Sequence, residues 1–203
     1  MRGVLSREDI LRGLRRLDEK SRTAGLVVEI AIYGGAALCL AFDTRVATRD
    51  VDAVIRSAPQ FVRAAARDIA REEEWPEDWL NDGVKGFIAA SEDLRLMQEF
   101  TAPGGTGLRI FMPSPEYLFA MKCMSMRAEG LDGSHEISDI EVLADIAGIA
   151  DADEALSIVE GFYPSSRIPP KVKFGVEEIM ERVVSRRAAA KRKSPPRQGK
   201  RPK

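Results

Sequence analysis

The spacing of apolar residues changes along the chain, and this change predicts where its elements lie. In residues 7–20 apolar positions recur every three to four residues after Ser6-Arg7-Glu8-Asp9, a run typical of a capped helix start. Residues 26–32 are rich in β-branched side chains and predict a strand. Gly34 and Gly35 end that strand, and residues 36–42 favour a short helix. The pattern therefore predicts a helix followed by a strand, a glycine turn and a second helix.

The next part of the chain alternates between strand-like and helix-like segments. The expected elements are a polar connection over 43–49, a strand over 50–55, a helix from Pro59 to the acidic run 72–74, a mixed turn region over 79–90, and strands over 94–100 and 108–112. The glycine-rich segment between the last two strands suits a hairpin connection.

After Pro113 the spacing is helical throughout. The predicted helices cover residues 116–128, 135–146, 153–162 and 171–190. We therefore expect an α+β fold in which a mixed sheet is followed by a C-terminal helical bundle. The expected parts are an N-terminal helix (1–22), an α/β core (23–113), a helical domain (114–190) and a disordered basic tail (191–203).

Composition narrows the class of protein. The 203 residues are 44% hydrophobic and 31% charged, which is typical of a globular protein. No window approaches the roughly 18 consecutive apolar residues of a membrane span, and the first residues lack the apolar run of a signal peptide. We expect a cytoplasmic protein without membrane contact. Two cysteines and one histidine are too few for a disulfide framework or a Cys/His zinc site, so any metal is expected to have oxygen ligands.

The net charge of −1 conceals a strong asymmetry. The segment from Arg186 to Lys203 contains nine basic residues and no acidic one, so acidic residues are in excess in the rest of the chain. Such a tail is typical of non-specific contact with nucleic-acid phosphates, or of a solubilising extension. The sequence leaves both interpretations open.

Two carboxylates are the clearest candidates for chemistry. Asp50 and Asp52 lie at positions i and i+2 of a predicted strand, so both point to one face about 7 Å apart along the chain. Neighbouring carboxylates repel unless a cation lies between them, which favours a Mg²⁺ site over a solvated strand face. The turn at Gly34 and Gly35 allows the backbone to approach a ligand closely.

These residues also carry a family resemblance. Tyr33-Gly34-Gly35, a short helix and then Thr48-Arg49-Asp50-Val51-Asp52 resemble the signature of the polymerase-β-like nucleotidyltransferases. Residues 115–122, which end in Lys122, resemble a helix of the AbiEii-type toxin nucleotidyltransferases.

The resemblance continues through Arg127 and through residues 138–143, which include Asp139. A related group of uncharacterised bacterial proteins shares the Trp-Leu-Asn-Asp element at residues 79–82. The resemblance covers residues 25–180 and implies a nucleotidyltransferase core within the mixed sheet.

The resemblance implies transfer of a nucleoside monophosphate from an NTP to an acceptor hydroxyl, with release of pyrophosphate. The implied acceptor is RNA, including the 3′ end of tRNA, or a protein. It further implies the toxin of a toxin–antitoxin or phage-defence pair, with a cognate antitoxin as partner. The implied cofactor is Mg²⁺ or Mn²⁺.

Individual roles follow from the same resemblance. Asp50 and Asp52 would hold the metal, and Gly34 and Gly35 would cradle the phosphates. The residues that would contact the nucleotide are Lys122, Arg49 and Arg127. Lys122 and Asp139 would be catalytic residues beside the acidic pair. Without the resemblance, Lys122 is better explained as a surface lysine with a buried stem. Asp139 is then explained equally well as an acidic residue favoured early in a helix.

Two departures from the family pattern leave a second hypothesis open. Gly35 stands where many members have serine, and Arg109 stands where a third carboxylate is common, with Glu99 on the preceding strand as a substitute. The alternative is a catalytically degenerate module that binds a nucleotide or a partner protein. A DNA-binding regulator ranks last, because the chain has no recognisable helix-turn-helix.

Overall fold

The first helix begins where its capping residues predict. A computed structural model describes residues 3–100, 105–126 and 135–193. In it, β1 (Leu5–Ser6) leads into α1 (Arg7–Thr23). The Ser6 hydroxyl accepts a hydrogen bond from the backbone N–H of Asp9, and the Asp9 carboxylate accepts one from the backbone N–H of Ser6. This reciprocal capping satisfies two N–H groups that the helix itself leaves unpaired.

The four predicted strands and one further short strand, β5, form a mixed sheet of five strands in the order β5-β4-β2-β7-β6. Their bounds are β2 (Val27–Ile32), β4 (Val51–Ile55), β5 (Leu80–Asn81), β6 (Leu94–Glu99) and β7 (Gly107–Pro113). The central strand β2 is antiparallel to β4 and parallel to β7, while β5 is parallel to β4 and β6 is antiparallel to β7. The α+β class and the mixed sheet are therefore confirmed.

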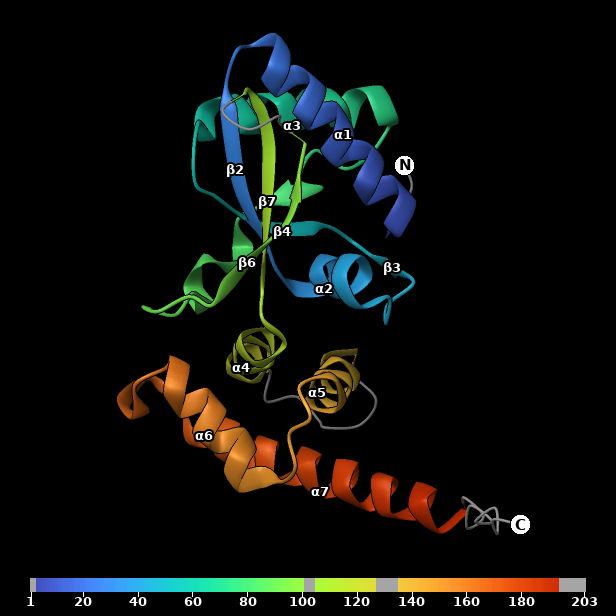
Figure 1. Ribbon diagram of the computed structural model, residues 1–203, viewed down its shortest axis with the longest axis vertical. Coiled ribbons are helices and arrows are strands. Elements are labelled where there is room, and N and C mark those ends of the chain that lie inside the picture. Colours follow the sequence, from blue (N-terminus) through green and yellow to red (C-terminus); the bar gives the residue numbers. More distant parts are fainter. Residues whose placement is uncertain (1–2, 101–104, 127–134, 194–203) are drawn as a thin grey trace, which may run out of the picture.

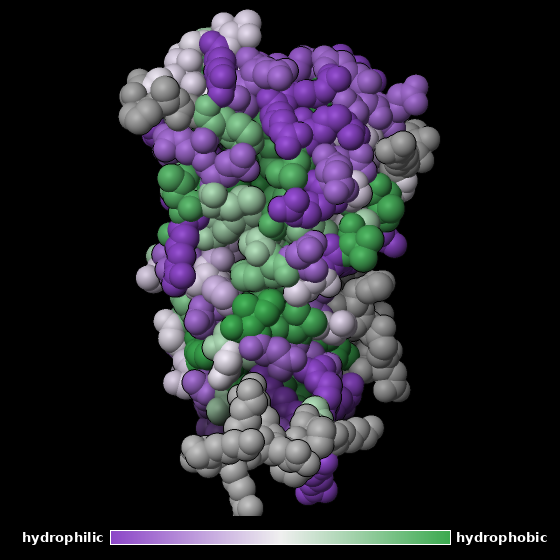
Figure 2. Space-filling model, turned by 45° about the vertical axis from the view of Figure 1, so that its right-hand side comes forward, coloured by the Kyte–Doolittle hydropathy of each residue, from purple (hydrophilic) through white to green (hydrophobic). Residues whose placement is uncertain are grey.

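Helices α1 and α3 (Pro59–Glu73) pack together beside the sheet (Figure 1). Trp79 is fully buried next to them, and its indole N–H donates to the carbonyl of Ala66 at 2.9 Å. A Cβ at Gly13 of α1 would lie 2.7 Å from the Trp79 ring, so only glycine fits this contact. The outer faces are hydrophilic (Figure 2), and ion pairs such as Arg12–Glu73 link the two helices.

Within residues 114–126 and 135–193, helices and one 3₁₀ turn are the only regular elements, as expected. Helices α4 (Pro115–Ser125), α5 (His135–Ile146), α6 (Ala152–Phe162) and α7 (Pro170–Lys193) pack on one another below the sheet (Figure 1). Helix α4 follows β7 directly, because Ser114 caps it by accepting a hydrogen bond from the backbone N–H of Tyr117. The end of β7 thus fixes where α4 begins relative to the sheet.

Several boundaries differ from the prediction. Helix α2 (Gly34–Ala37) starts at the first glycine and continues as the π-helix η1 (Leu38–Phe42), so the glycines belong to the helix start. Within the expected polar connection, β3 (Ala47–Thr48) pairs with β1. The unassigned turn region contains β5 and the 3₁₀ helix η2 (Gly83–Phe87), and a further 3₁₀ turn, η3 (Ser165–Arg167), precedes α7.

The ends of two predicted helices also need comment. Helix α4 ends at Ser125, and Arg127 and Ala128 lie outside the described residues. Helix α7 continues to Lys193, while residues 194–203, most of the expected basic tail, also lie outside them. Across the parts of the chain that the structure describes, no helix is both long and apolar enough to cross a membrane.

Candidate functional site

Three elements meet at the predicted acidic pair: the start of β4, the start of α2 and the last turns of α4. The backbone N–H of Tyr33 donates to the carbonyl of Asp52 at 2.9 Å, which holds the glycine turn beside the carboxylate. Asp52 and Lys122 both line two adjoining cavities. Asp52 and Lys122, which are 70 positions apart in the sequence, are therefore brought to one place.

Asp52 is in an environment that disfavours its charge. Burial raises the pKa of Asp52, the negative charge of Asp50 raises it further, and the Lys122 ammonium opposes both effects. Within the described residues, no ion pair joins either aspartate to a lysine or arginine. Among the described residues, the Lys122 ammonium therefore balances the negative charge of the site from a distance, and no direct ion pair neutralises it.

Asn81 is a site residue that the sequence reasoning missed. Its side-chain amide donates to Asp50 Oδ2 at 2.9 Å, and its Oδ1 accepts from the backbone N–H of Gly83 at 2.8 Å. Parallel pairing of β5 with β4 places Asn81 opposite Asp52. The signal in the sequence was the Trp-Leu-Asn-Asp element: the buried Trp79 anchors β5, and its carbonyl accepts from the backbone N–H of Val51.

Both glycines of the turn are required by close contacts. Gly34 has a φ of +62°, and a Cβ there would lie 2.5 Å from Asp52 Oδ2. A Cβ at Gly35 would lie 2.6 Å from Thr48 Oγ1 and 3.1 Å from Arg45 Nη1. A serine at position 35 would therefore collide with Thr48. The Thr48 hydroxyl itself lies beside position 35.

Lys122 and Asp139 are paired with each other. Lys122 Nζ lies 2.8 Å from Asp139 Oδ2, and Arg45 Nη1 lies 3.0 Å from the same oxygen. Asp139 is only 9% exposed, so its charge is compensated by two cations in a largely buried place. This arrangement fits a residue that positions Lys122 and Arg45.

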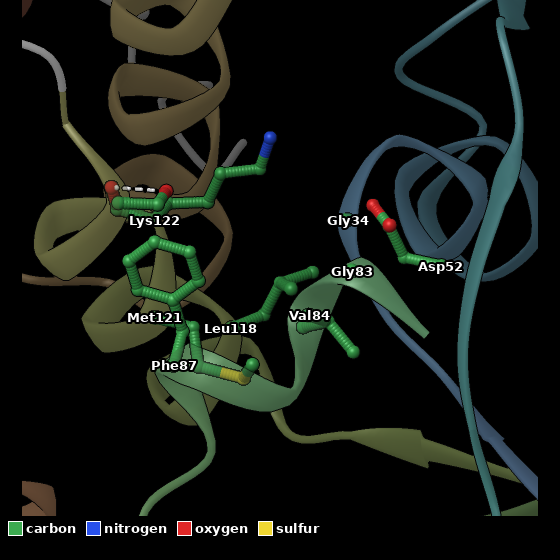
Figure 3. Close-up of a pocket in the computed structure, with 9 residues that line it drawn as sticks. Gly34, Asp52, Gly83, Val84, Phe87, Leu118, Met121 and Lys122 are labelled. Carbon is green, nitrogen blue, oxygen red and sulfur yellow. Dashed lines mark hydrogen bonds between the residues drawn. The ribbon is translucent and has the colours of Figure 1, made fainter. Parts of the chain in front are cut away.

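The two cavities differ in character. One, of about 180 Å³, lies between η2 and α4, with Asp52 and Lys122 at its upper rim and Phe87, Leu118 and Met121 below (Figure 3). The other, of about 760 Å³, is polar and is lined by segment 44–50 together with Asp139. The smaller cavity suits a flat apolar group, and the larger one suits a charged group.

Of the two arginines predicted to contact the nucleotide, the structure describes Arg49 but not Arg127. Arg49 is exposed and lines the polar cavity, and no described carboxylate pairs with its guanidinium. It is therefore available to bind an anion. Arg127 lies outside the described residues.

Neither Arg109 nor Glu99 lies beside the acidic pair. Arg109 is opposite Glu29 in the β2–β7 register, and the backbone N–H of Arg56 donates to the carbonyl of Glu29. Arg56, Glu29 and Arg109 therefore lie side by side, just after the end of β4, on β2 and on β7. Because Arg56 is four residues beyond Asp52, this row of residues is about 13 Å from Asp52 along the strands. Glu99 is therefore not a substitute for the third carboxylate, and Arg109 does not occupy its position.

The acidic pair fits a hard divalent cation. Mg²⁺ typically binds proteins through one or two carboxylates and completes its shell with water and substrate phosphate oxygens. Asp50 and Asp52 supply such a pair. Burial and then the charge of Asp50 raise the pKa of Asp52, and a cation between the two carboxylates would relieve their repulsion. No cluster of three or more acidic, histidine or cysteine side chains suited to a metal occurs among residues 3–100, 105–126 and 135–193.

The chain was compared with models of known protein families, with curated proteins and with solved structures. None of the three comparisons found a match. The functional interpretation therefore depends on the geometry described above and on the resemblance of the motifs.

Proposed function

We propose that this chain is a metal-dependent nucleotidyltransferase that moves a nucleoside monophosphate from an NTP to an acceptor hydroxyl. The observation that carries the proposal is the pair Asp50 and Asp52, which forms no direct ion pair among the described residues and faces Lys122 where two cavities meet. A nucleotidyltransferase needs this combination, because it must hold a metal–triphosphate and an acceptor on either side of one reacting phosphorus.

Asp50 and Asp52 would hold Mg²⁺ or Mn²⁺. When bound, the metal neutralises phosphate charge and helps to align the nucleotide for in-line attack. Asn81 fixes the Asp50 carboxylate by a hydrogen bond, so one ligand is already oriented. The proposed metal site thus lies at the beginning of β4, an interior strand of the sheet, which is a rigid support.

The cationic groups have separate tasks in this proposal. Lys122, released in part from Asp139, contacts a phosphate of the NTP as a point charge. Asp139 keeps Lys122 and Arg45 in place before the nucleotide arrives. Gly34 allows phosphate oxygens to approach the backbone beside Asp52, because any side chain there would collide with the carboxylate.

The polar cavity is the place for the acceptor. Arg49 lines it together with the threonines 44 and 48, and these groups suit a phosphorylated or otherwise anionic acceptor such as RNA. The choice between RNA, tRNA and a protein hydroxyl, and the toxin role with a cognate antitoxin, are supported by the motif resemblance alone.

A second candidate is a nucleotide-binding module without transferase activity. It is favoured by the missing third carboxylate: Arg109 and Glu99 are remote from Asp52, and the described residues supply no replacement. This candidate keeps the same metal and nucleotide contacts but lacks a group to activate the acceptor hydroxyl.

Incubation with each α-³²P-labelled NTP, Mg²⁺ and total bacterial RNA tests the proposal. We expect label in RNA or on a protein band with the unmutated protein, and none with Asp52→Ala. Arg109→Met is the matched control, since it removes a charge at the other end of the sheet, and it should label normally.

The two candidates give different results in this experiment. Binding of Mg²⁺–NTP without any transfer, over a range of RNA and protein acceptors, supports the non-catalytic module. Absence of both transfer and nucleotide binding contradicts both candidates.

A further inference from the structure

Phe87 is an aromatic residue that the proposed chemistry leaves unexplained. It ends η2, lines the smaller cavity and is 37% exposed, although it is a large apolar side chain. In Figure 3 it lies on the same side of the cavity as Leu118 and Met121, with the Lys122 ammonium and the Asp52 carboxylate above it. An exposed aromatic ring beside a charged site is a typical recognition feature.

The backbone around Phe87 is held from the helical half. The Tyr163 hydroxyl donates to the carbonyl of Phe87, and the Arg167 guanidinium donates to the carbonyls of Gly86 and Ile88 at 2.6 and 3.0 Å. The backbone N–H of Ala89 donates to the Tyr117 hydroxyl at 3.0 Å. Four hydrogen bonds therefore fix the segment that carries the ring, and its exposure does not arise from a loose loop.

The cavity has a charged rim and an apolar interior. Asp52, Lys122 and Gly34 lie at the rim, and the interior is formed by Val84, Phe87, Leu118 and Met121. This distribution matches a ligand that has an anionic end and a flat apolar end. A nucleotide is such a ligand, because its phosphates are separated from its base by the sugar.

We propose that Phe87 is the stacking platform of a nucleobase subsite in the smaller cavity, with Leu118 and Met121 as its apolar wall. This inference depends on the proposed function, because the triphosphate must be held at Asp52 and Lys122 for the base to reach Phe87. A face of the phenyl ring contributes attraction to any of the four bases, since each has a π-face.

The proposed subsite accounts for the affinity for nucleotides but not for a preference among the four bases. Stacking on an aromatic ring is tolerant of the base, whereas discrimination requires hydrogen bonds to the base edges. Ser125 is the one hydroxyl side chain among the described residues that line this cavity, and its hydroxyl donates to the carbonyl of Lys122. We therefore expect substitutions of Phe87 to affect all four NTPs to a similar degree.

Isothermal titration with ATP, GTP, CTP and UTP, each with Mg²⁺, tests the subsite, and inorganic tripolyphosphate with Mg²⁺ serves as the probe without a base. Phe87→Ala should weaken binding of every NTP about tenfold and leave tripolyphosphate within about twofold. Phe87→Trp should restore NTP binding. The control is Phe174→Ala, which removes a phenyl ring that is 70% exposed on α7 and should change neither ligand.

The outcomes separate this inference from the function on which it depends. If the unmutated protein binds NTPs and tripolyphosphate equally well, or if Phe87→Ala weakens both alike, the base subsite is wrong and the nucleotide site stands. If the unmutated, folded protein binds none of the NTPs, both proposals are wrong. Circular dichroism and thermal melting of Phe87→Ala check that the fold is kept.

Discussion

The two ends of the central strand β2 carry similar residue types in opposite electrostatic states. At one end, Arg109 lies 3.3 Å from Glu29 and 2.7 Å from Glu99, so a cation is shared between two carboxylates. At the other end, beside Tyr33, Asp50 and Asp52 have no ion-pair partner within the described residues, and the pKa of Asp52 is raised.

This contrast shows which charges are structural. The carboxylates at the Arg109 end, Glu99 and Glu29, raise the pKa of its guanidinium, which means that each of them favours the charged form of Arg109. At the Asp52 end, burial and like charge oppose ionisation, and the fold gains nothing from that arrangement in the absence of a cation. An unfavourable electrostatic arrangement that is built on a rigid strand points to a ligand.

The largest expected effect is that of Asp52→Asn on transfer. Removing one metal-binding carboxylate should lower kcat/KM by about 10³-fold or more, because the uncharged amide is a much weaker ligand for the metal that neutralises the phosphates. The measurement is single-turnover labelling with the NTP that the unmutated protein prefers. Activity within tenfold of the unmutated protein would contradict the role of Asp52.

Lys122→Met should have the next largest effect. It keeps the apolar stem of the side chain but removes the ammonium at the rim of both cavities, and we expect a loss of about 10²-fold in kcat/KM. Lys122→Arg retains the charge and serves as the partial-rescue variant. Equal activity of Lys122→Met and the unmutated protein would show that Lys122 merely pairs with Asp139.

Asn81→Ala tests the support of the metal site. Loss of the hydrogen bond to Asp50 should weaken Mg²⁺ binding by roughly tenfold, since partners of metal ligands typically contribute 10- to 100-fold. Activity should recover as the Mg²⁺ concentration is raised, which distinguishes weaker metal binding from a damaged catalytic step. A loss that Mg²⁺ does not reverse would contradict this role.

The raised pKa of Asp52 also predicts a pH effect on stability. The folded protein binds the proton of Asp52 more tightly than the unfolded chain does. Protonation of Asp52 therefore stabilises the fold at pH values below its ordinary pKa of 3.8, and this stabilisation is lost as the pH rises through the raised pKa. At neutral pH without metal, Asp52→Asn should therefore raise Tm. Melting curves at pH 4 and pH 7 measure this, and the gain should be smaller at pH 4.

Arg109→Met should have the smallest effect on function. It breaks a partly exposed ion cluster about 13 Å along the strands from Asp52, so transfer should stay within twofold and stability should fall only slightly. Urea unfolding and the labelling assay measure the two quantities. A tenfold loss of transfer would mean that the two ends of the sheet are coupled.

Local signals in the sequence were sufficient for much of the fold. The capping box at Ser6 fixed the start of α1, and the β-branched run before Gly34 located β2 within one residue. These predictions succeed because their causes lie within a few neighbouring residues. The acidic pair could be found for the same reason, since the i, i+2 relation belongs to a single strand.

Contacts between distant segments could not be found in this way. Asn81 reaches Asp50 only because β5 pairs with β4, and Phe87 is fixed by hydrogen bonds from Tyr163 and Arg167, about 80 positions later. The position of Arg109 likewise depends on the β2–β7 register. Strand pairing and docking of helices are properties of the whole chain, and no local pattern encodes them.

Calorimetric titration of ATP into the unmutated protein and into Asp52→Asn, each with and without Mg²⁺, tests the central claim most directly. We predict that the unmutated protein binds ATP much more tightly when Mg²⁺ is present, and that Asp52→Asn loses this dependence while it remains folded. Equal Mg²⁺-dependent binding by both proteins, or no binding by either, would contradict the claim that the pair Asp50 and Asp52 is a metal–nucleotide site.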